Sequence, residues 1–129
     1  MERSDSVIGA ALRARMRDRR RSEETGEELC TLDFDPGFPG FDGHFPGNPI
    51  VPGVCLIAAA RVFAEEVLGL PLEVAEIRQC RFRRPVQAGE RAEVHLRIAE
   101  PEPGVRQVQA SITVDGSPAA QLRLKAVAK

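Results

Sequence analysis

The sequence contains no tryptophan and no tyrosine, and only two histidines and three cysteines among its 129 residues. Without Trp or Tyr it lacks the aromatic platforms, interleaved with basic residues, on which single-stranded nucleic acids stack. The cysteines Cys30, Cys55 and Cys80 are odd in number and form no C-x-x-C pair, which argues against a disulfide framework and against a zinc site. We therefore expect a cytoplasmic protein with no metal, no cofactor and no nucleic-acid partner.

Long apolar runs are missing as well. No segment approaches the ~20 consecutive apolar residues that a membrane-spanning helix needs, so the sequence predicts no membrane span. The N-terminus has no basic segment followed by a long apolar stretch, which argues against a secretory signal. With 43% hydrophobic and 29% charged residues, the composition is typical of one globular domain.

The net charge of −1 conceals an asymmetric distribution. Residues 1–21 carry seven arginines against three acidic residues, whereas the rest of the chain has 11 basic and 16 acidic residues. Within this segment Ile8, Leu12 and Met16 recur at helical spacing. The pattern predicts an amphipathic helix over residues 6–21 whose apolar stripe docks on the domain. Binding of an acidic partner, such as a carrier protein, is an alternative use of the arginines.

Residues 22–27 look like a linker, so the sequence divides into an N-terminal helix and linker, 1–27, and a main domain, 28–129. A short β pattern at 28–34 is followed by a long loop, 35–53, that holds five of the ten prolines. Loops of this length in compact domains are usually functional.

One long helix is expected at about 53–68, since the segment is rich in Ala, Leu and Glu and Gly69 can end it. The helix is apolar nearly all round and must therefore be buried on most sides. Period-two alternation then predicts successive strands, with a hairpin turn at Asp115-Gly116. The expected strands cover residues 72–82, 91–98, 108–114 and 120–126. Together these features predict an α+β domain, an antiparallel sheet wrapped around one helix.

Residues 43–54, GHFPGNPIVPGV, closely resemble the active-site signature of the 3-hydroxyacyl-acyl-carrier-protein dehydratases. Residues 81–86, RFRRPV, and 88–90, AGE, resemble a second stretch that recurs in that family. The resemblance implies the hot-dog fold, a curved antiparallel sheet wrapped around one long central helix. It also implies pairing into a homodimer or a higher even oligomer, and an acyl thioester of acyl carrier protein or coenzyme A as substrate, in fatty acid or polyketide metabolism.

Carried over residue by residue, the resemblance makes His44 the base that removes the α-proton of a 3-hydroxyacyl thioester. Phe45 belongs to the same signature and is expected to contact substrate. The backbone N–H groups of Gly53 and Val54 open the expected helix and are suited to polarise the thioester carbonyl. Arg61, further along that helix, is expected at the mouth of the pocket or as an ordinary solvated side chain.

The chain departs from the family at Ala58, where the resemblance requires the catalytic glutamate of the central helix. Glu65 and Glu66 lie about 10–12 Å further along the helix axis at 1.5 Å per residue, which makes them poor substitutes. Asp42, two residues before His44, is a second candidate for the acid or for orienting the imidazole, although an aspartate beside a glycine is more often a turn former.

Three functions therefore remain open from the sequence. The first is a divergent dehydratase or hydratase of acyl thioesters that uses His44. The second is a non-catalytic subunit that binds an acyl chain or a carrier protein, paired with a homologue that supplies the acid. The third is a hot-dog thioesterase in which the same helix start serves hydrolysis.

Overall fold

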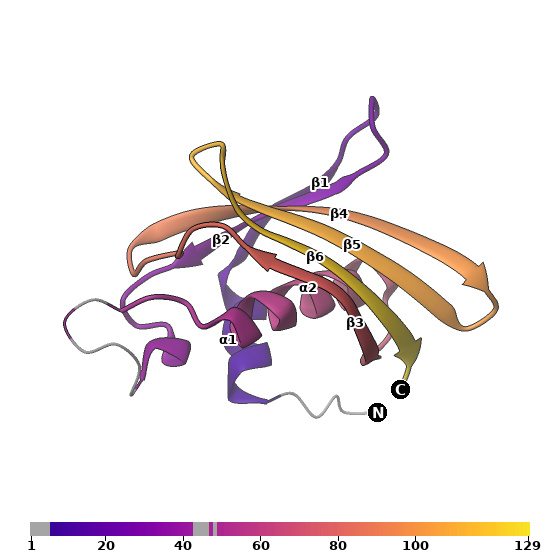
Figure 1. Ribbon diagram of the computed structural model, residues 1–129, viewed down its shortest axis with the longest axis horizontal. Coiled ribbons are helices and arrows are strands. Elements are labelled where there is room, and N and C mark those ends of the chain that lie inside the picture. Colours follow the sequence, from indigo (N-terminus) through magenta and orange to yellow (C-terminus); the bar gives the residue numbers. More distant parts are fainter. Residues whose placement is uncertain (1–5, 43–46, 48) are drawn as a thin grey trace.

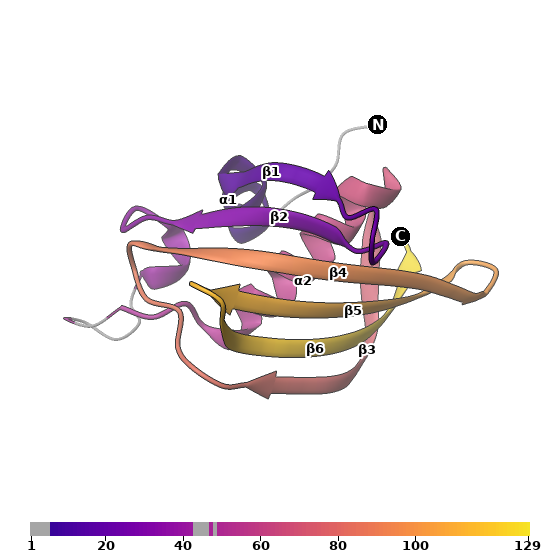
Figure 2. The ribbon, with the colours of Figure 1, turned by 90° about the horizontal axis from the view of Figure 1, so that it is seen from above.

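The computed structural model describes residues 6–42, 47 and 49–129. In this part of the chain one antiparallel sheet of six strands curves around a long helix (Figure 1). The strand order is β1-β2-β4-β5-β6-β3, which can be followed from above in Figure 2. In chain order the elements are α1 (Val7–Arg15), β1 (Met16–Arg21), β2 (Glu28–Phe34), the 3-10 turn η1 (Pro39–Phe41), α2 (Gly53–Leu68), β3 (Leu72–Phe82), β4 (Glu90–Glu102), β5 (Val105–Val114) and β6 (Ser117–Ala128).

The central helix α2 has the bounds that the sequence predicts. Its start at Gly53 follows Pro52, which lacks an N–H group, and it ends where Gly69 adopts the left-handed conformation with φ 71°. There the Gly69 N–H donates to the Glu65 carbonyl at 2.8 Å. Half of the helix residues are buried. Those with no exposed side-chain surface at all are Ala59, Ala60, Val62, Phe63 and Ala64.

The period-two pattern of the last three strands produces the expected two faces. On β4, Ala92, Val94 and Leu96 are fully buried against α2, and the residues between them point to the outer face. The predicted hairpin turn between β5 and β6 is confirmed, because Asp115 and Gly116 both have positive φ, at 50° and 78°. This is the combination that a tight two-residue hairpin requires.

The N-terminal segment differs from the prediction in its second half. The helix ends at Arg15, and Met16–Arg21 forms strand β1, antiparallel to β2. Residues 22–27 are therefore the turn of the β1–β2 hairpin and not a linker. The strand forms because it completes the sheet beside β2, a tertiary contact that a local helical pattern does not reveal. Docking of the helix itself is confirmed, since the Leu12 side chain is fully buried.

Strand β3 lies at the opposite edge of the sheet from β1 and pairs only with β6 in the described part of the chain. Apart from Leu72, its side chains are exposed or partly exposed. The large apolar ones among them are Ile77, 50% exposed, and Phe82, 49% exposed. None of the described helices is both long and apolar enough to cross a membrane.

Candidate functional site

An apolar pocket of about 410 Å³ opens at the start of α2. One wall is the segment that enters the helix, where the Val51 N–H donates to the Val86 carbonyl at 2.7 Å. The other wall is the end of β3 and the turn that follows it. The pocket is lined by Ile50, Val51, Gly53, Leu56, Phe82, Arg83, Arg84, Pro85 and Val86. Both stretches that carry the family resemblance thus contribute to one pocket.

The first two N–H groups of α2 belong to Gly53, which lines the pocket, and to the next residue, Val54. Pro52 caps the helix without a side-chain hydrogen bond, and its carbonyl accepts from the Cys55 N–H at 2.9 Å. The N–H groups of Gly53 and Val54 have no hydrogen-bond partner among the residues that the structure describes. A helix start with free N–H groups and a positive dipole end is suited to bind a carbonyl oxygen or an anion.

The Phe82 ring covers Gly53. A Cβ atom at position 53 would lie only 2.6 Å from Cζ of this ring, so glycine is what allows the close contact. The phenyl ring is half exposed and forms the side of the pocket nearest to the helix start. Sequence analysis did not single out Phe82. One signal could have pointed to it: Phe82 is a large aromatic residue that stands between arginines in the stretch RFRRPV.

One face of α2 is left partly uncovered. Val54 is 73% exposed, Ala58 is partly buried, and the Arg61 side chain is 21% exposed. These residues are four and three positions apart, so they share one side of the helix. The structure thus brings three residues that the sequence singled out, Val54, Ala58 and Arg61, onto one face, next to Gly53. Ala58 offers no acid there.

The nearest helix carboxylates are both held by arginines. Glu65 is 2% exposed, and it pairs with Arg13 of α1 and, at 3.0 Å, with Arg61. Its second oxygen also accepts the Leu72 N–H at 2.7 Å. Glu66 pairs with Arg13 at 2.6 Å. These contacts fix both side chains on the α1 side of the helix, which agrees with the expectation that neither substitutes for an acid at position 58.

The remaining predicted site residues come from the signature loop. His44 and Phe45 lie outside the described residues. Asp42 is exposed and follows η1, where its N–H donates to the Pro39 carbonyl at 3.1 Å. No described contact joins its carboxylate to α2, so its role as acid stays a prediction.

Cys55 and His95 carry groups that act as catalysts in many enzymes, but the surroundings of neither side chain indicate such a role here. Burial raises the pKa of the Cys55 thiol, which does not favour the thiolate that a nucleophile requires. His95 lies on the outer face of β4, away from α2, and its Nε2 lies 2.8 Å from Glu93 Oε1. The His95 side chain is 26% exposed.

The polar rim of the pocket is tied together by an ion pair. The Arg84 guanidinium lies 2.7 Å from Glu90 Oε2, and the Gln87 N–H donates to Glu90 Oε1 at 2.7 Å. Partial burial of the Glu90 carboxyl opposes its ionisation, but the Gln87 N–H and the Arg84 charge outweigh it and lower the pKa. The turn after β3 is thereby held in place beside the helix start.

Comparison with known proteins agrees with this architecture. A family model, ApeI-like, described as ApeI dehydratase, matches residues 19–123, so that α1 lies outside the match. A 3-hydroxyacyl-acyl-carrier-protein dehydratase FabZ of Ruegeria sp. (strain TM1040) is 33% identical over 100 residues, covering 69% of this chain and 62% of the relative. The FabZ of Thermomicrobium roseum is 39% identical over 90 residues, covering 64% of this chain and 60% of the relative. The chain thus spans about three fifths of the length of these curated relatives.

Solved structures with the same fold belong to proteins of several kinds. The dehydratase heterocomplex ApeI:P from Xenorhabdus doucetiae superposes with a TM-score of 0.74 at 24% identity, covering 87% of this chain and 96% of that chain. A hypothetical thioesterase from Streptococcus pneumoniae, solved with coenzyme A, superposes with a TM-score of 0.66 at 10% identity, covering 95% and 94%. At these identities the likeness shows the fold alone, and that fold is the hot-dog fold that the sequence resemblance implied.

Proposed function

Because this chain belongs to the ApeI-like dehydratase family, we propose that it binds acyl thioesters and interconverts 3-hydroxyacyl and enoyl thioesters, using His44 as the base. The pocket at the start of α2 carries the proposal. It combines an apolar lining for an acyl chain with the free N–H groups of Gly53 and Val54 for the thioester carbonyl. The FabZ relatives are 3-hydroxyacyl-acyl-carrier-protein dehydratases, which supports a substrate attached to acyl carrier protein.

The proposed reaction is an elimination of water next to a thioester carbonyl. His44 takes the α-proton, the electron pair forms the new carbon–carbon double bond, and the C3 hydroxyl leaves with a proton from an acid, as water. Negative charge develops on the thioester oxygen during this step, and the N–H groups of Gly53 and Val54 stabilise it in this proposal. Arg61, on the same face of α2, contacts the entering substrate.

The acid is the open part of this mechanism. Ala58 contributes none, and Glu65 and Glu66 are occupied by Arg13 and Arg61. Within this chain Asp42 is the candidate, since it precedes His44 by two residues. We therefore expect the wild-type protein to hydrate an enoyl thioester slowly, below the rate of an enzyme with a positioned acid.

The decisive experiment restores a carboxyl group at position 58. Hydration of an enoyl-pantetheine thioester is followed by loss of the enoyl absorbance in the wild type and in Ala58→Glu. The substitution is expected to raise the rate by about 10²–10⁴, the usual contribution of a positioned general acid. Because Ala58 is only partly buried, the added side chain has room to reach solvent. Ala59→Glu is the matched control, since Ala59 is fully buried and a carboxyl group there is expected to unfold the domain.

Two further variants and one further assay separate the possible outcomes. His44→Ala should abolish the gain produced by Ala58→Glu. If the wild type already turns over rapidly, is indifferent to Ala58→Glu and is inactivated by Asp42→Asn, then Asp42 is the acid. Release of free thiol from the acyl thioester without hydration would replace the lyase proposal by a thioesterase.

A non-catalytic role is the second candidate, favoured by the same lack of a free helix carboxylate. In this case the chain binds the acyl group and a homologous subunit supplies the acid. The dehydratase heterocomplex ApeI:P from Xenorhabdus doucetiae is a precedent for assembly of two different chains in this fold. Binding of an acyl-pantetheine analogue by wild type and by Ala58→Glu, with no turnover in either, would establish this role.

Pairing with a second copy is part of the proposal. Edge strand β3 and the face of α2 that carries Val54 expose apolar side chains that a monomer leaves in water, among them Ile77 and Phe82. A second copy placed across this edge continues the sheet and covers the open side of the pocket. A cytoplasmic location, predicted from the unpaired cysteines, belongs to the same proposal.

A further inference from the structure

Most arginines of the N-terminal segment, residues 1–21, form ion pairs or hydrogen bonds with other parts of the domain. Five of them contact carboxylates or carbonyls of other elements of the described chain. Arg13 pairs with Glu65 and Glu66, Arg15 with Asp35, Arg17 with Asp33 and Arg20 with Glu93, while Arg19 donates to the Glu66 carbonyl. These contacts tie the segment to the rest of the domain.

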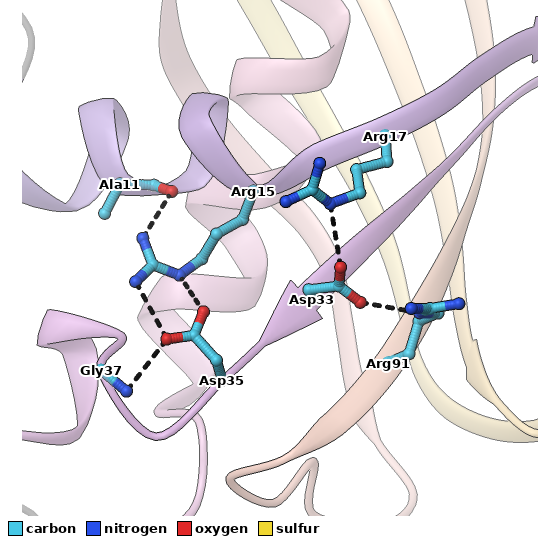
Figure 3. Close-up of polar contacts among 7 residues, drawn as sticks. All are labelled: Ala11, Arg15, Arg17, Asp33, Asp35, Gly37 and Arg91. Carbon is cyan, nitrogen blue, oxygen red and sulfur yellow. Dashed lines mark hydrogen bonds and ion pairs between the residues drawn. The ribbon is translucent and has the colours of Figure 1, made fainter.

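Arg15 is the last residue of α1, and its guanidinium group contacts both Asp35 and Ala11 (Figure 3). Its Nε lies 2.8 Å from Asp35 Oδ1 and its Nη2 lies 3.4 Å from Oδ2. Nη1 donates to the Ala11 carbonyl at 3.1 Å, which fixes the guanidinium at the end of α1. The guanidinium carbon also lies 5.5 Å from the centroid of the Phe38 ring, within cation–π distance.

Asp35 and Phe38 begin the loop that leads to the signature. Asp35 Oδ2 accepts the Gly37 N–H at 3.0 Å, and the Asp35 carbonyl accepts the Phe38 N–H at 2.9 Å. The Phe38 ring is fully buried and meets the rings of Phe34 and Phe41 edge to face, at centroid distances of 5.1 and 5.5 Å. Arg15 thus contacts two of the first residues of this loop, Asp35 and Phe38.

The same loop rests on the first turn of α2. A Cβ atom at Gly40 would lie 2.4 Å from the Phe38 ring and 3.0 Å from the Sγ of Cys55, so the backbone at Gly40 fits closely between them. Cys55 lies two residues after Gly53 and is 4% exposed. A continuous series of contacts therefore runs from Arg15 through Phe38 and Gly40 to the helix start that lines the pocket.

We propose that Arg15 is a positioning residue for the acyl-thioester pocket, acting through Asp35 and Phe38 on the loop and on the first turn of α2. The role rests on the proposed function, because it assigns Arg15 to that same site. Asp35 is half exposed, and an ion pair in such surroundings contributes little to global stability. Its effect is instead local, because it fixes how the loop lies against the helix start.

The test compares two arginines of the same segment. Arg15→Gln removes the contacts to Asp35 and Phe38, whereas the control Arg17→Gln removes an ion pair to Asp33 that Arg91 also serves at 2.7 Å (Figure 3). Binding of an acyl-pantetheine analogue is measured by calorimetry, and unfolding by urea. We expect Arg15→Gln to raise the Kd by about 10- to 100-fold, the size of effect that misplacement by about 1 Å produces. Both variants should unfold at similar urea concentrations, and Arg15→Lys should restore part of the affinity.

A second readout does not depend on the proposed function. The exposed thiol is first removed by Cys80→Ser. In this background Cys55 is expected to react with a thiol reagent at least about tenfold faster in Arg15→Gln than with Arg15 present, because the loop that covers Cys55 loosens. Buried Cys30 is the internal control and should stay protected. Unchanged protection of Cys55, or an unchanged Kd, would overturn the positioning role of Arg15. Failure of the protein with Arg15 intact to bind the analogue would instead overturn the proposed function, and the Cys55 rate alone would then decide whether Arg15 holds the loop on the helix.

Discussion

The phenyl ring of Phe82 lies against the Cα atom of Gly53, so that a Cβ at position 53 would meet Cζ at 2.6 Å and Cε2 at 2.8 Å. The last residue of β3 thus packs on the first residue of α2. These two residues close one side of the pocket, and a change in one must move the other.

We expect Gly53→Ala to displace the Phe82 ring and to weaken binding of an acyl-pantetheine analogue. The cost in stability should be small, below about 1 kcal/mol, because the half-exposed ring can turn outward. The double variant Gly53→Ala with Phe82→Leu frees space for the added methyl group and should recover affinity relative to Gly53→Ala alone. Equal affinities in calorimetry for all variants would show that the ring plays no part in the site.

Two valines with the same exposure test the pairing of two copies. Val54 in α2 and Val7 in α1 are each 73% exposed in the single chain. Val54→Lys places a charge on the face that we propose is covered by a second copy, so it should lower the mass measured by light scattering from a dimer to a monomer. Val7→Lys should leave the mass unchanged. A dimer that survives Val54→Lys would place the interface elsewhere.

The ion-pair network at the end of α2 is expected to be strongly stabilising as a unit. Glu65→Gln leaves the Arg13 and Arg61 guanidinium groups beside a buried neutral side chain, and should lower the free energy of unfolding by about 2–3 kcal/mol. Glu66 is 29% exposed, so Glu66→Gln should cost less than about 1 kcal/mol. Urea unfolding of both variants measures the difference, and equal losses would contradict the network.

Acid should weaken the ion pairs that Asp33 and Asp35 form with arginines, and the loss for the fold should come mainly from Asp33. Hydrogen bonds from Arg91 to Asp33, and from Arg15 to Asp35, hold the pKa of each carboxyl below its usual value. The folded state therefore binds protons at these carboxyl groups less readily than the unfolded chain does. The stabilisation that the ion pairs give the folded state is complete above the ordinary pKa of about 3.8, and it is lost as the pH falls through the lowered pKa values. Urea midpoints measured between pH 7 and pH 2.5 should fall less in Asp33→Asn than in wild type.

Sequence analysis predicted the elements whose patterns are unambiguous. The apolar surface of residues 53–68, with Gly69 behind it, leaves a buried helix as the only stable arrangement, and the structure confirms it. The helix predicted over residues 16–21 was wrong. The segment MRDRRR shows no clear apolar period of its own, and only its pairing with β2 makes it a strand. The strand expected over residues 91–98 continues as β4 to Glu102, past Pro101, and its register with β5 shifts between Ala99 and Glu102.

For the candidate site, the signature sequence predicted the place of Gly53 and Val54 at a helix start. It did not reveal the Phe82 contact, because Phe82 is 29 residues from Gly53 in the chain and meets it only when β3 and α2 pack together. Nor did it reveal that Arg13 and Arg61 occupy Glu65, which depends on how α1 docks. Such contacts join elements that local patterns describe only one at a time.

The pairing of β3 with β6 has a consequence for the order in which the chain folds. Leu72 pairs with Ala128 and Phe82 with Ala120, so β3 has no neighbour in the sheet until the final strand has been synthesised. During translation the apolar helix α2 and the unpaired β3 emerge well before the strand that covers them. Such non-local pairing is typical of domains that fold in roughly milliseconds to seconds, and during that interval the nascent chain exposes apolar surface that favours aggregation.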